Sequence, residues 1–313
     1  MSGKCLIVDE LHDNIHSLLQ GVGIEYTYEP TITRKEIIRI LPNYEGLIIR
    51  SKTRVDQELI STANLKYIAR AGAGVDNLDE DFLIAKGIKI LNAPEGNRDS
   101  VGEHTIGLIL NLLHNLHQAN DEVREKQWHR EPNRGLELGN MTVGIIGLGN
   151  SGLAVAKKLS GFGCQIIAYD KYLEQSTHPS YLTDLNTLFS EADILSLHIP
   201  LTHETRAMIN QSFLKKFSKP IFFINVSRGE IAPLGEIRQA LANGLIRKSA
   251  LDVLECEKFN LMNAEQLENF NWLKDSGKVI FTPHIAGWTH ESYARINEVL
   301  VEKIVHFLDK NTK

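Results

Sequence analysis

Short apolar runs alternate with amphipathic stretches along the first hundred residues of the chain. Five runs are rich in Ile, Leu, Val and Tyr, residues that favour β-strands: 5–9, 24–28, 46–51, 65–70 and 88–92. Four segments between them repeat apolar residues with helical spacing: 11–21, 33–41, 55–63 and 78–87. Repeated strand–helix units of this kind predict a parallel sheet with helices on both faces.

A second series follows a long helical stretch at 100–127. Six further runs are predicted to be strands: 141–147, 164–170, 193–200, 221–225, 247–253 and 278–284. Six parallel strands joined by helices make the arrangement that binds dinucleotides. The closing segment 290–310 has the spacing of one amphipathic helix, which we expect to pack on the first domain. The predicted fold class is α/β, with two doubly wound parallel-sheet domains.

Composition and charge narrow the class of protein. With 313 residues, 42% of them hydrophobic, and a net charge of −5, the chain is typical of a two-domain globular protein that binds no nucleic acid. No apolar run approaches the roughly 18 residues that a membrane span needs, and the start, MSGKCLIVDELHD, does not resemble a secretory signal. The cysteines Cys5, Cys164 and Cys256 form no CxxC pair, which predicts reduced thiols, no metal site and a cytoplasmic location.

A glycine motif marks the candidate cofactor site. Gly147, Gly149 and Gly152 have GxGxxG spacing between a predicted strand and a predicted helix, where a tight turn brings free backbone N–H groups to a pyrophosphate. Asp170 ends the next strand about 20 residues later, where a carboxylate binds the ribose hydroxyls of NAD and disfavours NADP. The alternatives are a tight turn without a ligand, and an ordinary turn residue at Asp170. The following Lys171 is interpreted as a solvated surface charge.

Three charged residues follow neighbouring predicted strands, where ligands bind in open α/β sheets. Arg228 can hold a carboxylate with two hydrogen bonds, His284 titrates near neutral pH and suits proton transfer, and Glu257 can stabilise the imidazolium. Glu255 could replace Glu257, because alternate residues of an extended chain point the same way. Each residue also has a structural interpretation, as an ion-pair partner or a hydrogen-bonded loop residue. Together, beside a dinucleotide motif, they predict a catalytic site.

Several strings of the sequence resemble one known family from end to end. RAGAGVDNLD (70–79), SVGEHTIGLIL, GLGNSG, SLHIPLT, NVSRGE, ALDVLECE and TPHIAG occur in the order found in the D-isomer-specific 2-hydroxyacid dehydrogenases. The resemblance implies a flavodoxin-like substrate-binding domain of residues 1–97 plus 288–313. It also implies an inserted Rossmann domain of residues 98–287 that binds NAD, and a 2-hydroxy or 2-keto acid as substrate.

The resemblance also assigns site residues. Arg228, Glu257 and His284 match the family's catalytic residues, and Ala73, Gly74 and Val75 match a loop whose amides hold the substrate carboxylate together with Arg228. Asp252 matches the residue that binds the nicotinamide carboxamide. The cofactor-binding set that the matching strings imply is Gly147, Gly149, Asn150, Ser151, Gly152, Asp170, His198, Pro200, Thr205, Val226, Ser227, Asp252 and Gly287.

Within the family the chain looks most like the D-3-phosphoglycerate dehydrogenases of serine biosynthesis. Arg50, Arg70 and Arg130 match arginines that contact the substrate phosphate, although each could be plain surface charge. The chain ends near residue 313, so no C-terminal regulatory domain is expected. It departs from the family at Asn150 and Ser151, which are unusually polar, at Lys258, where a proline is usual, and in the long segment that follows Glu257. We interpret this segment, 258–277, as a surface elaboration.

Three alternatives remain open. Glyoxylate/hydroxypyruvate reductases and D-lactate-type enzymes share Arg228, Glu257 and His284 without needing the additional arginines. Formate dehydrogenases also resemble the family, but Glu257 argues against them because they carry an amide there. NAD-binding co-repressors of this fold act as scaffolds, yet they usually carry long flexible tails.

Apolar residues on more than one face of the helical stretch 100–127 predict a subunit interface, and therefore a homodimer.

Overall fold

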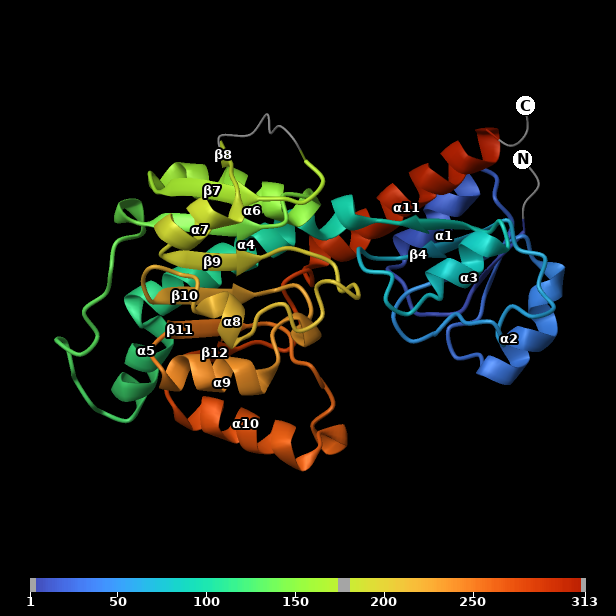
Figure 1. The fold of residues 1–313 in the computed structure, drawn as a ribbon. Helices are drawn as coiled ribbons and strands as arrows, with labels where there is room; N and C mark the ends of the chain where they lie inside the picture. Colours follow the sequence, from blue (N-terminus) through green and yellow to red (C-terminus); the bar gives the residue numbers. More distant parts are fainter. Residues whose placement is uncertain (1–3, 174–180, 311–313) are drawn as a thin grey trace. The chain divides into compact units, whose positions relative to one another are not determined.

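The chain forms two compact units in the computed structural model, which describes residues 4–173 and 181–310. Unit 1 consists of Met1–Arg98 and Trp288–Lys313, and unit 2 of Asp99–Gly287. The first boundary falls one residue later than the sequence predicts. Each unit is an α/β structure with a fully parallel sheet, as expected from the alternating pattern (Figure 1). Each is described by itself below.

Unit 1 contains a five-stranded sheet with the order β2-β1-β3-β4-β5. Its strands are β1 (Cys5–Ile7), β2 (Tyr26–Tyr28), β3 (Gly46–Ile49), β4 (Tyr67–Arg70) and β5 (Lys89–Asn92). This order is the flavodoxin-like arrangement, in which the chain reverses direction across the sheet between β1 and β3. The carboxyl ends of β1, β3 and β4 therefore lie side by side, and a charged residue lies at or within two residues of each end: Asp9, Arg50 and Arg70.

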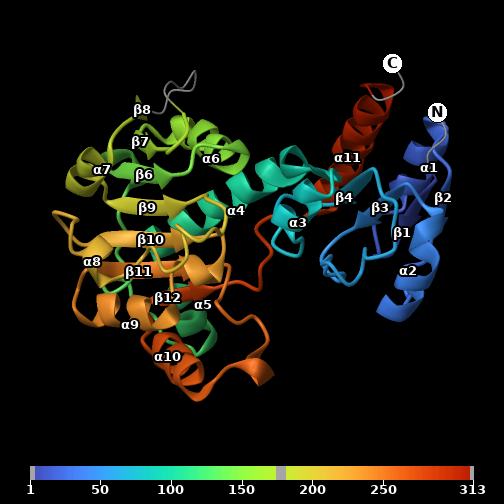
Figure 2. The ribbon, with the colours of Figure 1, turned by 45° about the vertical axis from the view of Figure 1, so that its right-hand side comes forward.

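Helices cover both faces of this sheet. They are α1 (Asn14–Gly21), α2 (Arg34–Ile40), α3 (Glu80–Ala85) and α11 (His290–Lys310), with the 3-10 helix η1 (Leu41–Asn43) after α2. One face is buried by α1 and α11, through residues such as Leu19 and Leu300, and the other by α2 and α3. Figure 2 shows α11 beside α1, although the two are far apart in sequence. The prediction that 290–310 is one helix packed on the first domain is confirmed.

Unit 2 contains a seven-stranded sheet with the order β12-β11-β10-β9-β6-β7-β8. Its strands are β6 (Thr142–Ile146), β7 (Gln165–Tyr169), β8 (Tyr181–Leu182), β9 (Ile194–Leu197), β10 (Ile221–Asn225), β11 (Ile246–Leu251) and β12 (Val279–Phe281). Six of them are the predicted strands, and the two-residue β8 was not predicted. The order is that of a Rossmann fold, and it reverses between β6 and β9, where such folds bind their ligands.

The helices of unit 2 bury the two faces of its sheet in separate cores. They are α4 (Pro94–His114, whose first turn belongs to unit 1), α5 (Leu116–Arg124), α6 (Asn150–Leu159), α7 (Leu185–Glu191), α8 (Gln211–Leu214), α9 (Leu234–Ala242) and α10 (Ala264–Asp275). Short 3-10 helices are η2 (Leu138–Asn140), η3 (Ser160–Phe162), η4 (Gly229–Ile231) and η5 (Phe259–Leu261). Residues of α4 and α6 form one core, and residues of α7 to α10 form the other.

Two helix predictions were wrong, for local reasons. Residues 55–63 form turns, because Val55 pairs with Leu78 in a bridge and the Asp56 carboxylate accepts a hydrogen bond from the Leu59 amide. The stretch 100–127 belongs to two helices, because Asn115 adopts a left-handed conformation with a φ of 54° between α4 and α5. Asparagine tolerates this conformation better than most residues.

Candidate active site

Glu257 and His284 lie within hydrogen-bonding distance in unit 2. They follow the neighbouring strands β11 and β12, and His284 Nδ1 is 2.8 Å from Glu257 Oε1. Both side chains are about half exposed, at 43% and 47%, so water can reach the pair. The alternative partner, Glu255, is partly buried, and this burial raises the pKa of its carboxyl group. The structure thus pairs His284 with the second glutamate of the ECE string.

The backbone around His284 is held by Asp252, which follows β11. The Asp252 carboxylate is buried and accepts hydrogen bonds from the Thr282 hydroxyl at 2.6 Å and from the amides of Ile285 and Ala286 at 2.9 and 2.8 Å. The His284 amide donates to the Asp252 carbonyl at 2.8 Å. His284 itself has a φ of 56°, a left-handed conformation that costs a residue with a side chain about 1–2 kcal/mol. The hydrogen bonds of Asp252 offset this cost. We name residues 282–287 the histidine loop.

Two residues of α4 support the same loop. His104 Nε2 lies 3.2 Å from the Thr282 hydroxyl and 3.5 Å from the Asp252 carboxylate. The buried Ser100 hydroxyl donates to the Ala286 carbonyl at 2.8 Å. The helix therefore holds the histidine loop at both ends. Both residues belong to the string SVGEHTIGLIL, which is one of those that resemble the family. Their contacts with the histidine loop could not be predicted from that string.

Arg228 is presented by a loop that the buried Asn225 closes. The Asn225 side chain donates to the Arg228 carbonyl at 2.9 Å and accepts from the Ser227 amide at 3.0 Å. The guanidinium donates to the Ser227 carbonyl at 2.7 Å. At Gly229 a Cβ atom would lie 1.9 Å from the carbonyl carbon of Leu254, so glycine lets this loop contact the segment after β11. Arg228 follows β10, and Glu257 follows the neighbouring strand β11.

The glycine motif forms the predicted turn between β6 and α6. Gly147 has a φ of 91°, and a Cβ atom there would lie 2.3 Å from the His198 carbonyl oxygen. A Cβ atom at Gly152 would lie 1.9 Å from the Gly147 carbonyl oxygen, whereas one at Gly149 would meet nothing within 4 Å. The first and third glycines are thus required by packing, and the second leaves open space at the start of the ten-residue helix α6. This arrangement fits a pyrophosphate bound by the helix N-terminus.

Asp170 follows β7 and contacts the glycine motif directly. Its carboxylate accepts hydrogen bonds from the Leu148 amide at 2.8 Å and the Tyr172 amide at 2.9 Å. An ionised carboxylate has about four acceptor positions, so these bonds leave room for ribose hydroxyls. Lys171 forms an ion pair with Glu204. Its charge is therefore balanced within the protein, which lessens its ability to attract a 2′-phosphate.

The other predicted cofactor residues lie in loops at the same edge of the sheet. His198 follows β9, with Nε2 2.8 Å from the Ser196 hydroxyl, and burial lowers the pKa of its ring to about 3. The ring is therefore neutral near pH 7. The Thr205 hydroxyl donates to the Pro200 carbonyl at 2.8 Å. The remaining members lie in the turn after β10, in the first turn of α6 and at the end of the histidine loop: Val226, Ser227, Asn150, Ser151 and Gly287.

The predicted substrate residues of unit 1 lie at the carboxyl ends of β3 and β4. Ile49 pairs with Arg70, so Arg50 and Arg70 end neighbouring strands. The Arg70 guanidinium lies over Gly72, where a Cβ atom would be 1.6 Å from Nη1. The Asn92 side chain donates to the Ala73 carbonyl at 2.6 Å. Within the described residues of the chain, no backbone hydrogen bond is formed by the amides of Gly74 and Val75, which suits them to bind a carboxylate.

Arg130 and the segment 258–277 lie away from these elements in the chain. Arg130 is exposed in the segment after α5, in unit 2. Most of 258–277 is η5 and α10, whose buried Asn269 accepts a hydrogen bond from Arg238 of α9 at 3.0 Å. Within the described ranges, no helix is long and apolar enough to cross a membrane. The same ranges contain no group of three or more His, Cys, Asp or Glu side chains placed to hold a metal ion.

Comparisons with known proteins agree with this geometry. The family model for the NAD-binding domain of D-isomer-specific 2-hydroxyacid dehydrogenases matches residues 106–286, more than half of the chain. The D-3-phosphoglycerate dehydrogenase of Archaeoglobus fulgidus is 34% identical over 307 residues, which cover 97% of this chain and 57% of that protein. The chain thus spans just over half the length of the curated phosphoglycerate dehydrogenases that it matches.

Two further relatives match over almost their whole length. The hydroxypyruvate reductase of Thermotoga maritima is 36% identical over 288 residues, or 92% of each chain. The crystal structure of D-lactate dehydrogenase from Aquifex aeolicus, complexed with NAD and lactic acid, has a TM-score of 0.83 at 25% identity and covers 99% of this chain and 96% of that one. The chain therefore belongs to the D-isomer-specific 2-hydroxyacid dehydrogenase family, and its residues 106–286 form the NAD-binding domain of that family.

Proposed function

We propose that this protein is an NAD-dependent D-2-hydroxyacid dehydrogenase. The observation that carries the proposal is the His284–Glu257 pair, held by the histidine loop at the carboxyl edge of a Rossmann sheet. An imidazole hydrogen-bonded to a carboxylate is a general acid–base group of the kind that alcohol oxidation needs. The family membership of the chain supports the same reaction class.

We propose that one ring atom of His284, Nε2, takes up and returns the proton of the reaction. Because Nδ1 lies 2.8 Å from Glu257, it carries the hydrogen of that bond and leaves Nε2 as the base. Nε2 takes the hydroxyl proton of the substrate during oxidation and returns it during reduction. Glu257 stabilises the imidazolium that forms. The open, half-exposed position of the pair lets this proton exchange with water.

Arg228 is proposed to bind the carboxylate of the substrate and to polarise its C2 oxygen. The Gly74 and Val75 amides of unit 1 are also proposed to bind a substrate carboxylate. A guanidinium presents paired N–H donors that match a carboxylate, which fixes the substrate as well as binding it. Such positioning lowers the barrier by reducing the entropy lost at the reactive step.

The residues of the glycine motif and its neighbours would hold NAD. The open space at Gly149 would receive the pyrophosphate, and Asp170 the adenine ribose hydroxyls. When bound, NAD accepts or returns the hydride of the reaction. The neutral ring of His198 adds no charge to this part of the site.

The substrate that we propose is D-3-phosphoglycerate, oxidised to 3-phosphohydroxypyruvate, which would place the enzyme in serine biosynthesis. Support comes from Arg50, Arg70 and Arg130, and from several phosphoglycerate dehydrogenases at 34–35% identity to the chain. The second candidate is reduction of hydroxypyruvate or glyoxylate. It is favoured by the Thermotoga maritima reductase, which matches this chain over 92% of its own length.

A panel of 2-hydroxy and 2-keto acids, each with NAD and NADP, tests these assignments. We expect NAD-dependent oxidation of D-3-phosphoglycerate, pulled forward by transamination of the product, with kcat/KM at least about tenfold above that for D-glycerate. Equal rates on the two acids would remove the phosphate assignment and favour the reductase. Binding of NADH without turnover of any acid would instead support a co-repressor-like scaffold.

We also propose a cytoplasmic homodimer. The apolar residues of α4 are buried within unit 2, so they do not provide a subunit interface. Exposed apolar side chains lie instead on α5 and just after it: Leu116, Val123 and Trp128, the last 77% exposed. The three cysteines form no disulfide, which agrees with a reducing compartment. Light scattering should give twice the chain mass, and Val123→Ser with Trp128→Ser should lower it; a wild-type monomer would contradict the proposal.

A further inference from the structure

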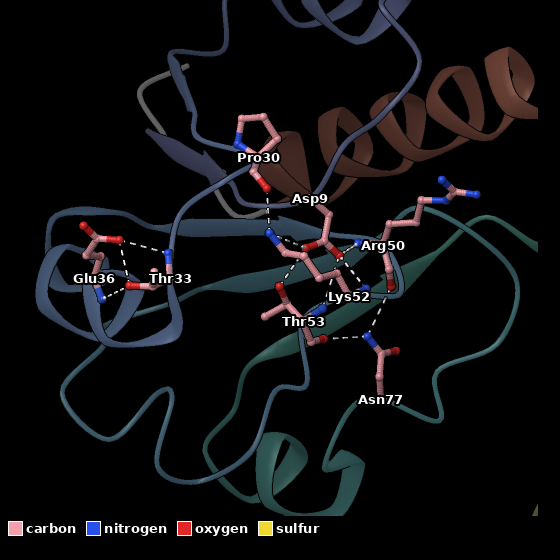
Figure 3. A network of polar contacts seen from close by, with 8 residues as sticks. All are labelled: Asp9, Pro30, Thr33, Glu36, Arg50, Lys52, Thr53 and Asn77. Atoms are coloured by element: carbon pink, nitrogen blue, oxygen red, sulfur yellow. Dashed lines mark hydrogen bonds and ion pairs between the residues drawn. The ribbon is translucent and has the colours of Figure 1, made fainter. Parts of the chain in front are cut away.

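A buried carboxylate in unit 1 organises the loop that carries Arg50. Asp9, which is 2% exposed, accepts hydrogen bonds from the amides of Arg50, Lys52 and Thr53 at 2.7, 3.2 and 3.4 Å. Its other oxygen accepts from the Thr53 hydroxyl at 2.7 Å. Figure 3 shows these contacts converging on one side chain. We name residues 50–53 the arginine loop.

A second side chain holds the same loop from the other end of the network. The Asn77 amide group donates to the carbonyls of Arg50 and Thr53, at 3.2 and 2.7 Å. The Lys52 ammonium lies 3.9 Å from Asp9 and donates to the Pro30 carbonyl at 2.6 Å. Three amides and two carbonyls of the arginine loop are therefore hydrogen-bonded, and the backbone of Arg50 is held at both N and O.

The guanidinium of Arg50 points away from this network (Figure 3). It is held by two aromatic rings. Its central carbon lies 4.0 Å from the ring centre of Trp288 and 4.9 Å from that of Tyr293, both in unit 1. The two rings are also in contact with each other, with centres 4.9 Å apart. Stacking engages the face of a guanidinium and leaves its N–H edge directed at acceptors in the plane.

The charge of Arg50 is not matched by an acid at close range. Within residues 4–173 and 181–310, no carboxylate lies within 4.0 Å of its side chain. Partial burial lowers the pKa of the guanidinium, although arginine stays protonated in proteins. An anion binds a partly desolvated guanidinium of fixed orientation with a more favourable free energy than an exposed and mobile one.

We infer that Asp9 is a positioning residue for substrate selection: Asp9 fixes the backbone of the arginine loop, Trp288 and Tyr293 fix the guanidinium, and together they present Arg50 to a second anionic group of the substrate. The inference rests on the proposed function, which supplies a substrate with such a group. The group is an oxyanion with at least two acceptor oxygens, such as a phosphate monoester. Asp9 does not contact it and acts only through Arg50.

A double-mutant cycle on substrate selectivity tests the inference. The measured quantity is the ratio of kcat/KM for D-3-phosphoglycerate to that for D-glycerate. Arg50→Gln should lower this ratio about 100-fold and Asp9→Asn about tenfold, mainly through KM of the phosphorylated acid. Adding Asp9→Asn to Arg50→Gln should change the ratio less than about twofold. If Asp9→Asn folds poorly, Asn77→Ala replaces it in the same cycle.

The aromatic contacts are tested by fluorescence, without turnover. With Trp128 and Trp272 replaced by Phe, Trp288 is the remaining tryptophan, and inorganic phosphate or D-3-phosphoglycerate should change its emission in a saturable way. Arg50→Gln should abolish the change, and Asp9→Asn should weaken the affinity about tenfold. In the kinetic assay, Trp288→Leu should lower the selectivity ratio and Trp288→Phe should largely restore it, because Phe keeps a ring under the guanidinium.

The outcomes separate the inference from the proposed function. Equal loss of kcat/KM on both acids in Asp9→Asn, or a tenfold further loss of the ratio in the double variant, would mean that Asp9 is merely structural and overturn the inference. A lack of turnover on every hydroxy acid, with phosphate still sensed by Trp288 and lost in Arg50→Gln, would contradict the function and keep the anion site. Normal turnover with no response of Trp288 to either anion would contradict the site and keep the function.

Discussion

Two buried aspartates, one in each unit, organise a functional loop by the same chemistry. Asp252 in unit 2 and Asp9 in unit 1 each follow a parallel strand and accept backbone amides of one loop. Each also accepts a threonine hydroxyl, from Thr282 at 2.6 Å and from Thr53 at 2.7 Å. A carboxylate is suited to this task because it accepts several hydrogen bonds and donates none.

The two loops differ in what they hold. The histidine loop keeps His284 in a left-handed conformation, whereas no residue of the arginine loop, 50–53, has a positive φ. His284 is proposed to move a proton and needs an orientation that the chain does not adopt readily. Arg50 is proposed only to bind, and its long side chain is oriented by aromatic rings. Backbone strain is thus found where the proposed chemistry requires it, and is absent where binding is sufficient.

The largest effect should come from removing the proton-transferring group. His284→Gln should lower kcat by at least about 1,000-fold, because this substitution removes the proposed acceptor of the hydroxyl proton. NADH binding, followed by its fluorescence, should change less than about threefold. Turnover near the wild-type value would show that another group transfers the proton. The histidine loop would then not differ from the arginine loop in carrying a catalytic residue.

The matched pair Asp252→Asn and Asp9→Asn compares the two loops directly. Each variant turns an NH₂ group toward backbone amides and should cost about 2–3 kcal/mol of unfolding free energy in urea denaturation. Only Asp252→Asn should also lower kcat about 100-fold, because it releases the backbone of His284. Similar kcat values in the two variants would show that the histidine loop does not depend on its aspartate.

The two glutamates of the ECE string provide a control within one segment. Glu257→Gln should lower kcat about 10- to 100-fold, since the imidazolium loses its charged partner. The half-exposed pair contributes little to stability, so the unfolding free energy of the Glu257→Gln variant should differ from that of the wild type by less than about 1 kcal/mol. Glu255→Gln should change kcat less than about twofold. A reversal of this order would assign the role to Glu255.

The smallest effects should come from the threonine hydroxyls. Thr282→Val and Thr53→Val each delete one hydrogen bond to a buried carboxylate and should each cost about 1–2 kcal/mol of stability. Thr282→Val should lower kcat about three- to fivefold, and Thr53→Val less than about 1.5-fold. Urea denaturation and steady-state kinetics on the same preparations measure both quantities. Equal kcat losses would show that the two loops are coupled to chemistry to the same degree.

Much of the fold could be predicted because hydrophobic periodicity determines which segments become strands of a parallel sheet. Six of the seven strands in unit 2 and all five in unit 1 were predicted. The errors lie where tertiary contacts override local preference. Residues 55–63 have helical spacing but are held by the Val55–Leu78 bridge, and Asn115 breaks a helix that its neighbours would continue. The two-residue β8 is too short to leave a pattern.

The site was predicted unevenly for a similar reason. Glu257, His284 and the glycines belong to compact strings, and the proximity of Glu257 to His284 follows from the neighbouring strands β11 and β12. Asp9 could not be assigned a role, because its partners lie more than 40 residues away in the chain. Trp288 was not singled out, because a lone aromatic next to the TPHIAG string has no meaning until Arg50 is known to stack on it.

The double role of Asp170 constrains how this enzyme family member can change its coenzyme. The carboxylate proposed to discriminate against a phosphorylated ribose also anchors the Leu148 amide inside the glycine turn that is proposed to bind the pyrophosphate. A single mutation that admitted NADP by removing this carboxylate would at the same time loosen the turn that both coenzymes need. A lineage, or an engineer, seeking the other coenzyme must therefore supply a new anchor for the turn before the old acid can be given up.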